Sequence, residues 1–130
     1  MIYTKGIKYQ LFEDEPVRTE ILGCAIDTDY YSLTPDGVLT AFRGYAWDGS
    51  SGAIDTANSM LASLFHDALC QCIGREELPL DCLDAANELY YEICLSKGMS
   101  RIRAGLQFKA IEFHFRNGVK PEGDRELFYA

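Results

Sequence analysis

The spacing of apolar residues changes near residue 48. Before that point, short runs of β-branched and aromatic residues alternate with turn residues, as in residues 6–12, 17–22 and 30–33. Runs of this length and composition are typical of strands. After residue 58, apolar residues recur at the spacing of a helix face. The pattern predicts an α+β fold, in which a small N-terminal antiparallel sheet is followed by a C-terminal unit of three helices packed on it.

The clearest turn signal is the tetrapeptide Thr34-Pro35-Asp36-Gly37. Proline fixes the backbone angle of the first turn position, and glycine can take the positive φ that such turns need. The turn therefore predicts a β-hairpin that joins residues 30–33 to residues 38–42.

The first two helices are predicted from one apolar face each and from their end signals. The first begins at Asn58 or Ser59, either of which can serve as the N-cap, and ends at Gly74. The second begins just after Pro79 and ends at Gly98. Its acidic residues fall on the opposite side, which we expect to face water. The expected apolar face of this helix comprises Leu83, Ala86, Tyr90, Ile93 and Cys94.

The third helix, about residues 100–117, has two apolar stripes instead of one. A helix of this kind is covered on two sides. We expect it to lie between the helical pair and the sheet, although burial against another subunit would give the same pattern. The first stripe comprises Ile102, Leu106, Ala110 and Phe113, and the second comprises Ala104, Phe108, Ile111 and Phe115.

Length and charge limit the classes of function. The 130 residues suit one domain, divided into a strand-rich half (1–48), a Gly/Ser loop (49–58), three helices (59–118) and a tail (119–130). A net charge of −8 disfavours nucleic-acid binding. No stretch approaches the roughly 18 uninterrupted apolar residues of a membrane span, and no signal peptide is visible. We therefore expect a cytoplasmic protein, or one carried inside an assembly.

The five cysteines do not form a metal-binding pattern. They are odd in number and include no CxxC pair. We expect buried free thiols, with oxidised links between neighbouring copies as the alternative. A catalytic cysteine would need a nearby base, and His66 is the only histidine in the same helical neighbourhood as Cys70 and Cys72.

Polar chemistry is concentrated where the two halves meet. The segment from Gly44 to Gly52 holds three glycines, Trp47, Asp48 and two serines. Glycine-rich loops let backbone groups converge on a ligand, but a Trp-packed strand-to-helix connection would have the same composition.

His66 is predicted to meet Asn87 across the first helical hairpin. If the two helices are antiparallel, positions whose numbers sum to about 153 lie level with each other. Asn87 sits on an apolar face, where an unpaired amide would cost about 1–3 kcal/mol. Its oxygen can accept the N–H of His66 and fix the tautomer of the ring. The alternative is that the two residues simply form a polar pair that locks the helices together.

Four motifs in order resemble a family encoded mainly by tailed bacteriophages and prophages, which is catalogued as domain of unknown function 1353. They are Trp47-Asp48-Gly49-Ser50-Ser51-Gly52, Ser63-Leu64-Phe65-His66-Asp67-Ala68-Leu69, Ala86-Asn87 and Lys97-Gly98-Met99. The resemblance spans roughly residues 44–115. It implies a phage or prophage origin, expression in the host cytoplasm and incorporation in the virion as one outcome. Two positions depart from the family pattern, since Cys70 replaces an aromatic residue and Asn87 replaces a carboxylate.

The loop, the His-Asp pair and the facing helix are also similar to secreted calcium-dependent phospholipases. By that analogy His66 is the general base and Asn87 orients it. Asp67 then joins Asp48, Gly49 and Gly52 in holding a divalent cation such as calcium. An amide stabilises an imidazolium less than a carboxylate does, so this site would be slow or inactive. The disulfide framework of those enzymes is absent.

Two functions follow. The favoured one is a small non-enzymatic tailed-phage protein, a virion or assembly component or an accessory factor, whose partners are other phage structural proteins or further copies of itself. The alternative is a metal-assisted hydrolase of the esterase or phospholipase kind, with His66 as general base, Asp67 beside it in the catalytic group, and oxygen ligands suited to a hard cation.

Overall fold

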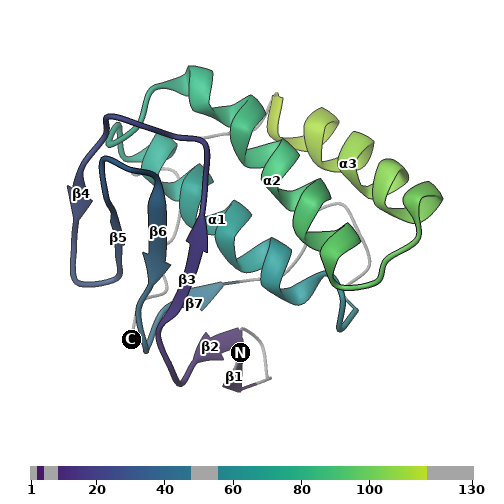
Figure 1. Ribbon diagram of the computed structural model, residues 1–130, viewed down its shortest axis with the longest axis horizontal. Coiled ribbons are helices and arrows are strands. Elements are labelled where there is room, and N and C mark those ends of the chain that lie inside the picture. Colours follow the sequence, from purple (N-terminus) through teal and green to yellow (C-terminus); the bar gives the residue numbers. More distant parts are fainter. Residues whose placement is uncertain (1–2, 5–8, 48–55, 117–130) are drawn as a thin grey trace.

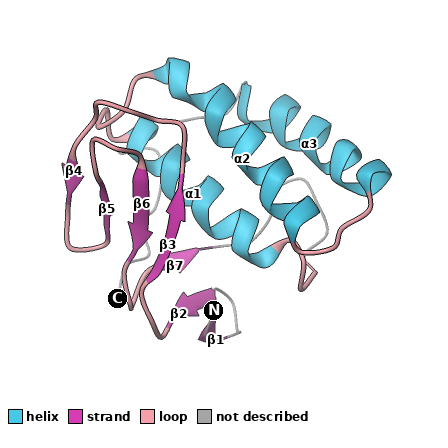
Figure 2. Ribbon diagram, in the orientation of Figure 1, coloured by secondary structure: helices cyan, strands magenta, loops and turns pink. Residues whose placement is uncertain are grey.

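The computed structural model describes residues 3–4, 9–47 and 56–116 (Figure 1). Strands occupy one side of the molecule and the helices the other, as the colouring of Figure 2 shows. The predicted α+β fold, with its antiparallel strands first and its three helices after them, is confirmed. The strands are β1 (Tyr3–Thr4), β2 (Tyr9–Leu11), β3 (Glu15–Arg18), β4 (Ile26–Asp27), β5 (Tyr31–Leu33), β6 (Val38–Ala41) and β7 (Ala46–Trp47).

The strands form two antiparallel sheets where one was predicted. The first has the order β1-β2-β7 and the second the order β3-β6-β5-β4. The segment predicted as a strand over residues 17–22 leaves the sheet after Arg18. Both the backbone N–H and the hydroxyl of Thr19 donate to the carbonyl oxygen of Gly37, at 2.7 and 2.9 Å, and the hydroxyl accepts from the N–H of Ile21. The bonds to Gly37 extend the contact with the hairpin by one residue, and the bond from Ile21 then turns the chain away from the sheet.

The predicted hairpin is confirmed. Strands β5 and β6 pair antiparallel, with Leu33 opposite Leu39. Gly37 has a φ of +95° and donates its N–H to the carbonyl of Thr34 at 2.9 Å. A Cβ added at Gly37 would lie 2.6 Å from the carbonyl oxygen of Thr19. Glycine is therefore required here for both its conformation and its small size.

The three helices match the predicted ones closely. They are α1 (Met60–Gly74), α2 (Leu83–Ser96), which follows a 3₁₀ turn over Leu80–Cys82, and α3 (Arg101–Arg116). Ser59 occupies the N-cap of α1, but its side chain bonds to Thr56 and not to the helix. Gly74 is the last residue of α1, and the positive φ comes two residues later, at Glu76.

The helices are arranged so that α1 is the most enclosed and α3 the most peripheral. α1 packs against α2 and against strand β6, whereas α3 packs against α2, on the far side from the strands (Figure 1). The expectation that α3 lies between the helical pair and the sheet is wrong. In the second stripe Ala104 and Ile111 are buried and Phe108 is half-buried, whereas the side chain of Phe115 lies outside the described residues. In the first stripe Ile102, Leu106 and Phe113 are exposed and Ala110 is half-buried. Among the helices that the structure describes, none combines the length and the apolar character needed to cross a membrane.

Candidate functional site

The predicted pair of His66 and Asn87 is present. His66 lies near the middle of α1, Asn87 lies in the second turn of α2, and Nε2 of the histidine is 2.7 Å from Oδ1 of the amide. Both side chains are buried, with 4% and 2% of their surface exposed. The antiparallel pairing that placed them level with each other is therefore confirmed. An amide oxygen can only accept, so Nε2 of His66 carries the proton in this bond.

The pair continues into a set of contacts that ties all three helices together. The ring of His66 meets the ring of Tyr90 edge to face, with centroids 5.7 Å apart and planes at 78°. The hydroxyl of Tyr90 then donates to Oε1 of Gln107 on α3, at 2.8 Å. Gln107 is itself buried. Buried polar groups in this set therefore hold α1 to α2 and α2 to α3.

Cys70 lies one turn after His66 and is fully buried. Its sulfur is 3.7 Å from Nδ1 and 3.8 Å from Nε2 of the imidazole. A thiol aligned with one ring nitrogen would lie in the ring plane along that nitrogen's lone pair, and it would be much farther from the other nitrogen. The nearly equal distances place the sulfur over the ring. A nucleophile activated by hydrogen bonding to its base does not have this arrangement.

Three aromatic side chains fix the strands to the region of α1 and the turn after it. The indole N–H of Trp47 donates to the hydroxyl of Ser63 at 2.9 Å, and Ser63 donates in turn to the carbonyl of Met60. The hydroxyl of Tyr45 donates to Oε1 of Gln71 at 3.1 Å. The hydroxyl of Tyr31 donates to Oε1 of Glu77 at 2.5 Å.

Sequence reasoning found none of these three bonds. It singled out Trp47 only as a packing residue of the connection. The signal that could have found two of them is the presence of Ser63 and Gln71 on a largely apolar helix, because buried polar side chains need partners.

The predicted cation site falls largely in a part of the chain that is not described. Asp48, Gly49 and Gly52 lie outside the described residues. Asp67 is half-buried on α1, about 100° around the helix axis from His66. Within residues 3–4, 9–47 and 56–116, no group of three His, Cys, Asp or Glu side chains is placed to hold a metal ion.

All five cysteines are free thiols in the structure. The expectation that they are buried is confirmed for Cys70, Cys72 and Cys94 and is wrong for Cys24 and Cys82. Burial raises the pKa of Cys72 to about 12, with a further contribution from the charge of Glu77. Burial also raises the pKa of Cys94 to about 11. Cys24 and Cys82 are only half-buried. Cys72 and Cys94 therefore stay protonated at neutral pH, and the protonated form is the unreactive one.

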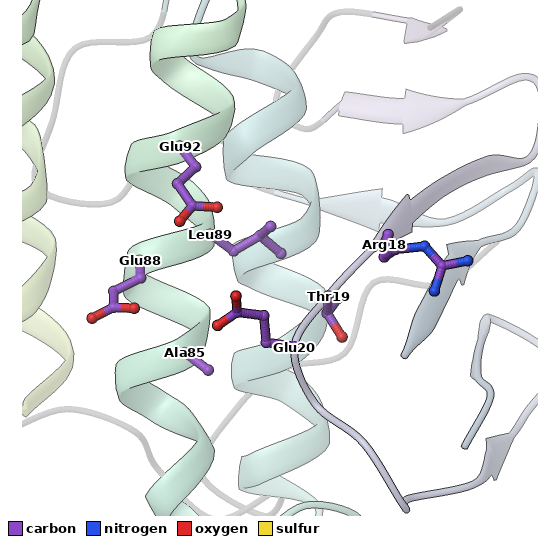
Figure 3. A pocket seen from close by; sticks show the side chains of 7 residues that line it. All are labelled: Arg18, Thr19, Glu20, Ala85, Glu88, Leu89 and Glu92. Atoms are coloured by element: carbon purple, nitrogen blue, oxygen red, sulfur yellow. The ribbon is translucent and has the colours of Figure 1, made fainter. Parts of the chain in front are cut away.

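Two surface hollows adjoin α2. One, of about 40 Å³, lies between α2 and the chain that follows β3, where Glu20 and Glu92 point toward Leu89 and Glu88 projects away from it (Figure 3). The second, of about 300 Å³, opens near the start of α2 and the end of α3. Its lining combines three acidic residues, two leucines and the 2% exposed Asn87: Leu80, Asp81, Leu83, Asp84, Asn87 and Glu112.

Comparison of the chain with protein-family models, with curated proteins and with solved structures gives no match.

Proposed function

We propose that this chain is a non-enzymatic protein of a tailed phage or prophage, acting as a virion or assembly component or as an accessory factor during infection. The observation that carries the non-enzymatic part is the burial of His66 and Asn87, which are 4% and 2% exposed and bonded to each other. The order of the four motifs that resemble the phage family supports the phage origin.

The chemistry of the pair favours a structural role over catalysis. A general base must come within hydrogen-bond reach of the proton that it takes from a substrate or a water. His66 is enclosed between α1 and α2, it presents its Nε2 proton to Asn87, and its ring packs on Tyr90. Asn87 carries no charge to stabilise an imidazolium. Two polar groups that satisfy each other inside a helix pair fix how those helices sit together.

The competing proposal is a metal-assisted hydrolase in which His66 is the base, and Asp48 and Asp67 hold a divalent cation. It predicts that calcium, magnesium, manganese or zinc binds the native state and raises its melting temperature. The non-enzymatic proposal predicts no shift with these ions beyond that of a sodium chloride control of equal ionic strength. A specific shift that is lost in Asp67→Asn, while the variant stays folded, would favour the hydrolase.

The virion form of the proposal is tested by quantitative mass spectrometry of purified particles of the phage that encodes the chain. A fixed copy number per particle supports a structural component. Absence from the particle, together with abundance in the infected cell, would restrict the proposal to an assembly or accessory role.

A further inference from the structure

The outer face of α3 exposes large apolar side chains. Ile102 is 80% exposed, Leu106 is 66% exposed and Phe113 is 77% exposed. At about 100° per residue these three positions fall within about 40° of one another around the helix axis. We call them the outer stripe. Exposed apolar side chains scattered singly need no explanation, but several on one helix face are typical of an interaction surface. The exposed Lys109 lies on the same face, between Leu106 and Phe113 and about 20° from Ile102, so the long stem of a lysine completes the row.

Charged groups flank the outer stripe in a particular order. Arg101 and Glu112 project from the same side of α3, each about 80–100° from Ile102. Arg101, at the start of the helix, is exposed. Glu112, near its end, lines the 300 Å³ hollow together with Asp81 and Asp84. The same edge of the helix is therefore positive at one end and strongly negative at the other.

An edge of this kind is complementary to itself when two copies run antiparallel. In an antiparallel helix pair related by a two-fold axis, each flank of one helix faces the same flank of the other. A pair centred near Leu106 and Gln107 brings Arg101 of each copy to Glu112 of the other. The same alignment puts Leu106 beside its own copy and Ile102 near Phe113 of the second copy.

We propose that the outer stripe of α3 is a two-fold interface between copies of this chain, in which Arg101 of each copy enters the acidic hollow of the other. An anionic membrane surface fits less well, because it would attract Arg101 and Lys109 but would repel the carboxylates of the hollow and a chain of net charge −8. A uniformly basic or acidic partner would satisfy only one end of the edge. This inference does not rest on the proposed function.

The expected dimer is weak. Standard protein interfaces bury about 1,600 Å² in total, and one helix pair supplies less than that. A dissociation constant of about micromolar or weaker is therefore expected. The test is sedimentation equilibrium of the full chain over a wide range of protein concentration, in low salt and with reductant to keep the half-buried thiols apart. The wild-type chain should change reversibly between monomer and dimer.

Two variants, made at leucines of equal exposure, test whether the outer stripe is the interface. Leu106→Glu should weaken the dimer by about tenfold or more, because it places a charge beside its own copy at the centre of the interface. Leu22→Glu is the matched control, since Leu22 is also 66% exposed but lies far from α3 in the chain, just after β3. It should leave dimerisation unchanged. Circular dichroism and melting temperature check that both variants fold.

A charge exchange tests the antiparallel alignment. Arg101→Glu should weaken the dimer, and Arg101→Glu combined with Glu112→Arg should restore most of the lost affinity, with both effects reduced at high salt. A wild-type chain that stays monomeric at every concentration would overturn the proposal. Equal effects of Leu106→Glu and Leu22→Glu, or failure of the exchange to restore affinity, would also overturn it. A monomer that binds anionic vesicles would replace it with a membrane-binding helix.

Discussion

α1 and α3 depart from the usual distribution of side chains in opposite ways. α1 buries polar groups, among them Ser63, His66 and Gln71, and each of them forms a hydrogen bond with a residue outside the helix. α3 leaves Ile102 and Leu106 in water. A buried polar group with its partner in place shows how the elements of a protein are held together. An exposed apolar row shows where the protein can contact another molecule. The comparison assigns internal assembly to α1 and external contact to α3.

The largest expected effect is a difference in stability between alanine substitutions at two leucines, one on each of these helices. Leu69 on α1 is fully buried, and Leu106 on α3 is 66% exposed. Leu69→Ala should lower the free energy of unfolding by about 2–5 kcal/mol, because it removes buried methyl groups and leaves a cavity. Leu106→Ala, measured at a concentration where the chain is monomeric, should cost less than about 1 kcal/mol. Urea unfolding of both variants measures the difference in the free energy of unfolding. Similar losses in the two variants would contradict the difference between α1 and α3.

The next effect concerns the polar joint between α1 and α2. His66→Leu and Asn87→Leu should each cost about 1–3 kcal/mol, because each leaves one buried polar group without its partner. The double variant should cost little more than either single one, since no orphaned group remains. A double-mutant cycle in urea measures this coupling. Additive losses would mean that the hydrogen bond does not join the helices.

The effect of the buried thiols of α1 and α2 is confined to high pH. The folded chain keeps Cys72 and Cys94 protonated to higher pH than the ordinary value near 9. Above pH 9 the unfolded chain therefore binds fewer protons than the folded one, and stability falls as the pH rises through about 11 for Cys94 and about 12 for Cys72.

Each of these thiols contributes a slope of up to about 1.4 kcal/mol per pH unit. Urea unfolding between pH 8.5 and 10.5 measures the total slope, and Cys72→Ala should make it shallower. An unchanged slope in that variant would contradict the burial of this thiol. α3 contains no cysteine and contributes nothing to the effect.

The smallest effect tests the open side of α3. A Cβ added at Gly105, within the helix, meets nothing within 4 Å. Gly105→Ala should therefore stabilise the monomer by about 0.5–1 kcal/mol through helix propensity. Gly23→Ala is the control, because Gly23 also has open space but has a φ of +78°. That substitution should destabilise the chain by about 1 kcal/mol. Loss of stability in Gly105→Ala would show that this face is not open.

The parts of the fold that sequence reasoning predicted are those with a strong local cause. The turn at Thr34–Gly37 follows from proline and glycine at fixed positions, and the three helices follow from long periodic segments. The pairing of His66 with Asn87 follows from hairpin geometry alone. Strands β4 and β7 have two residues each, which is too short to show a period of two, so the division into two sheets could not be predicted.

The position of α3 could not be predicted for a different reason. Its two apolar stripes are equivalent in the sequence, and only packing decides that Ala104 and Ile111 turn inward while Ile102 and Leu106 turn outward. The aromatic bonds to α1 and to the turn after it join residues as far apart as Tyr31 and Glu77, and no local pattern links such positions. The predicted cation ligands Asp48, Gly49 and Gly52 lie outside the described residues, so that part of the site stays a prediction.

The one-sided attachment of α3 has a consequence for the motions of the folded chain. α1 touches both the strands and α2, so its amides can exchange with solvent only when most of the molecule opens. α3 packs mainly on α2, and its separation would leave the contacts between α1 and the strands intact. The native state therefore contains a cooperative unit that can open alone, at a lower free energy than global unfolding. Any partner that covers the outer stripe would raise the free energy of this opening. Its binding would be detected as slower amide hydrogen exchange in α3 and in no other helix.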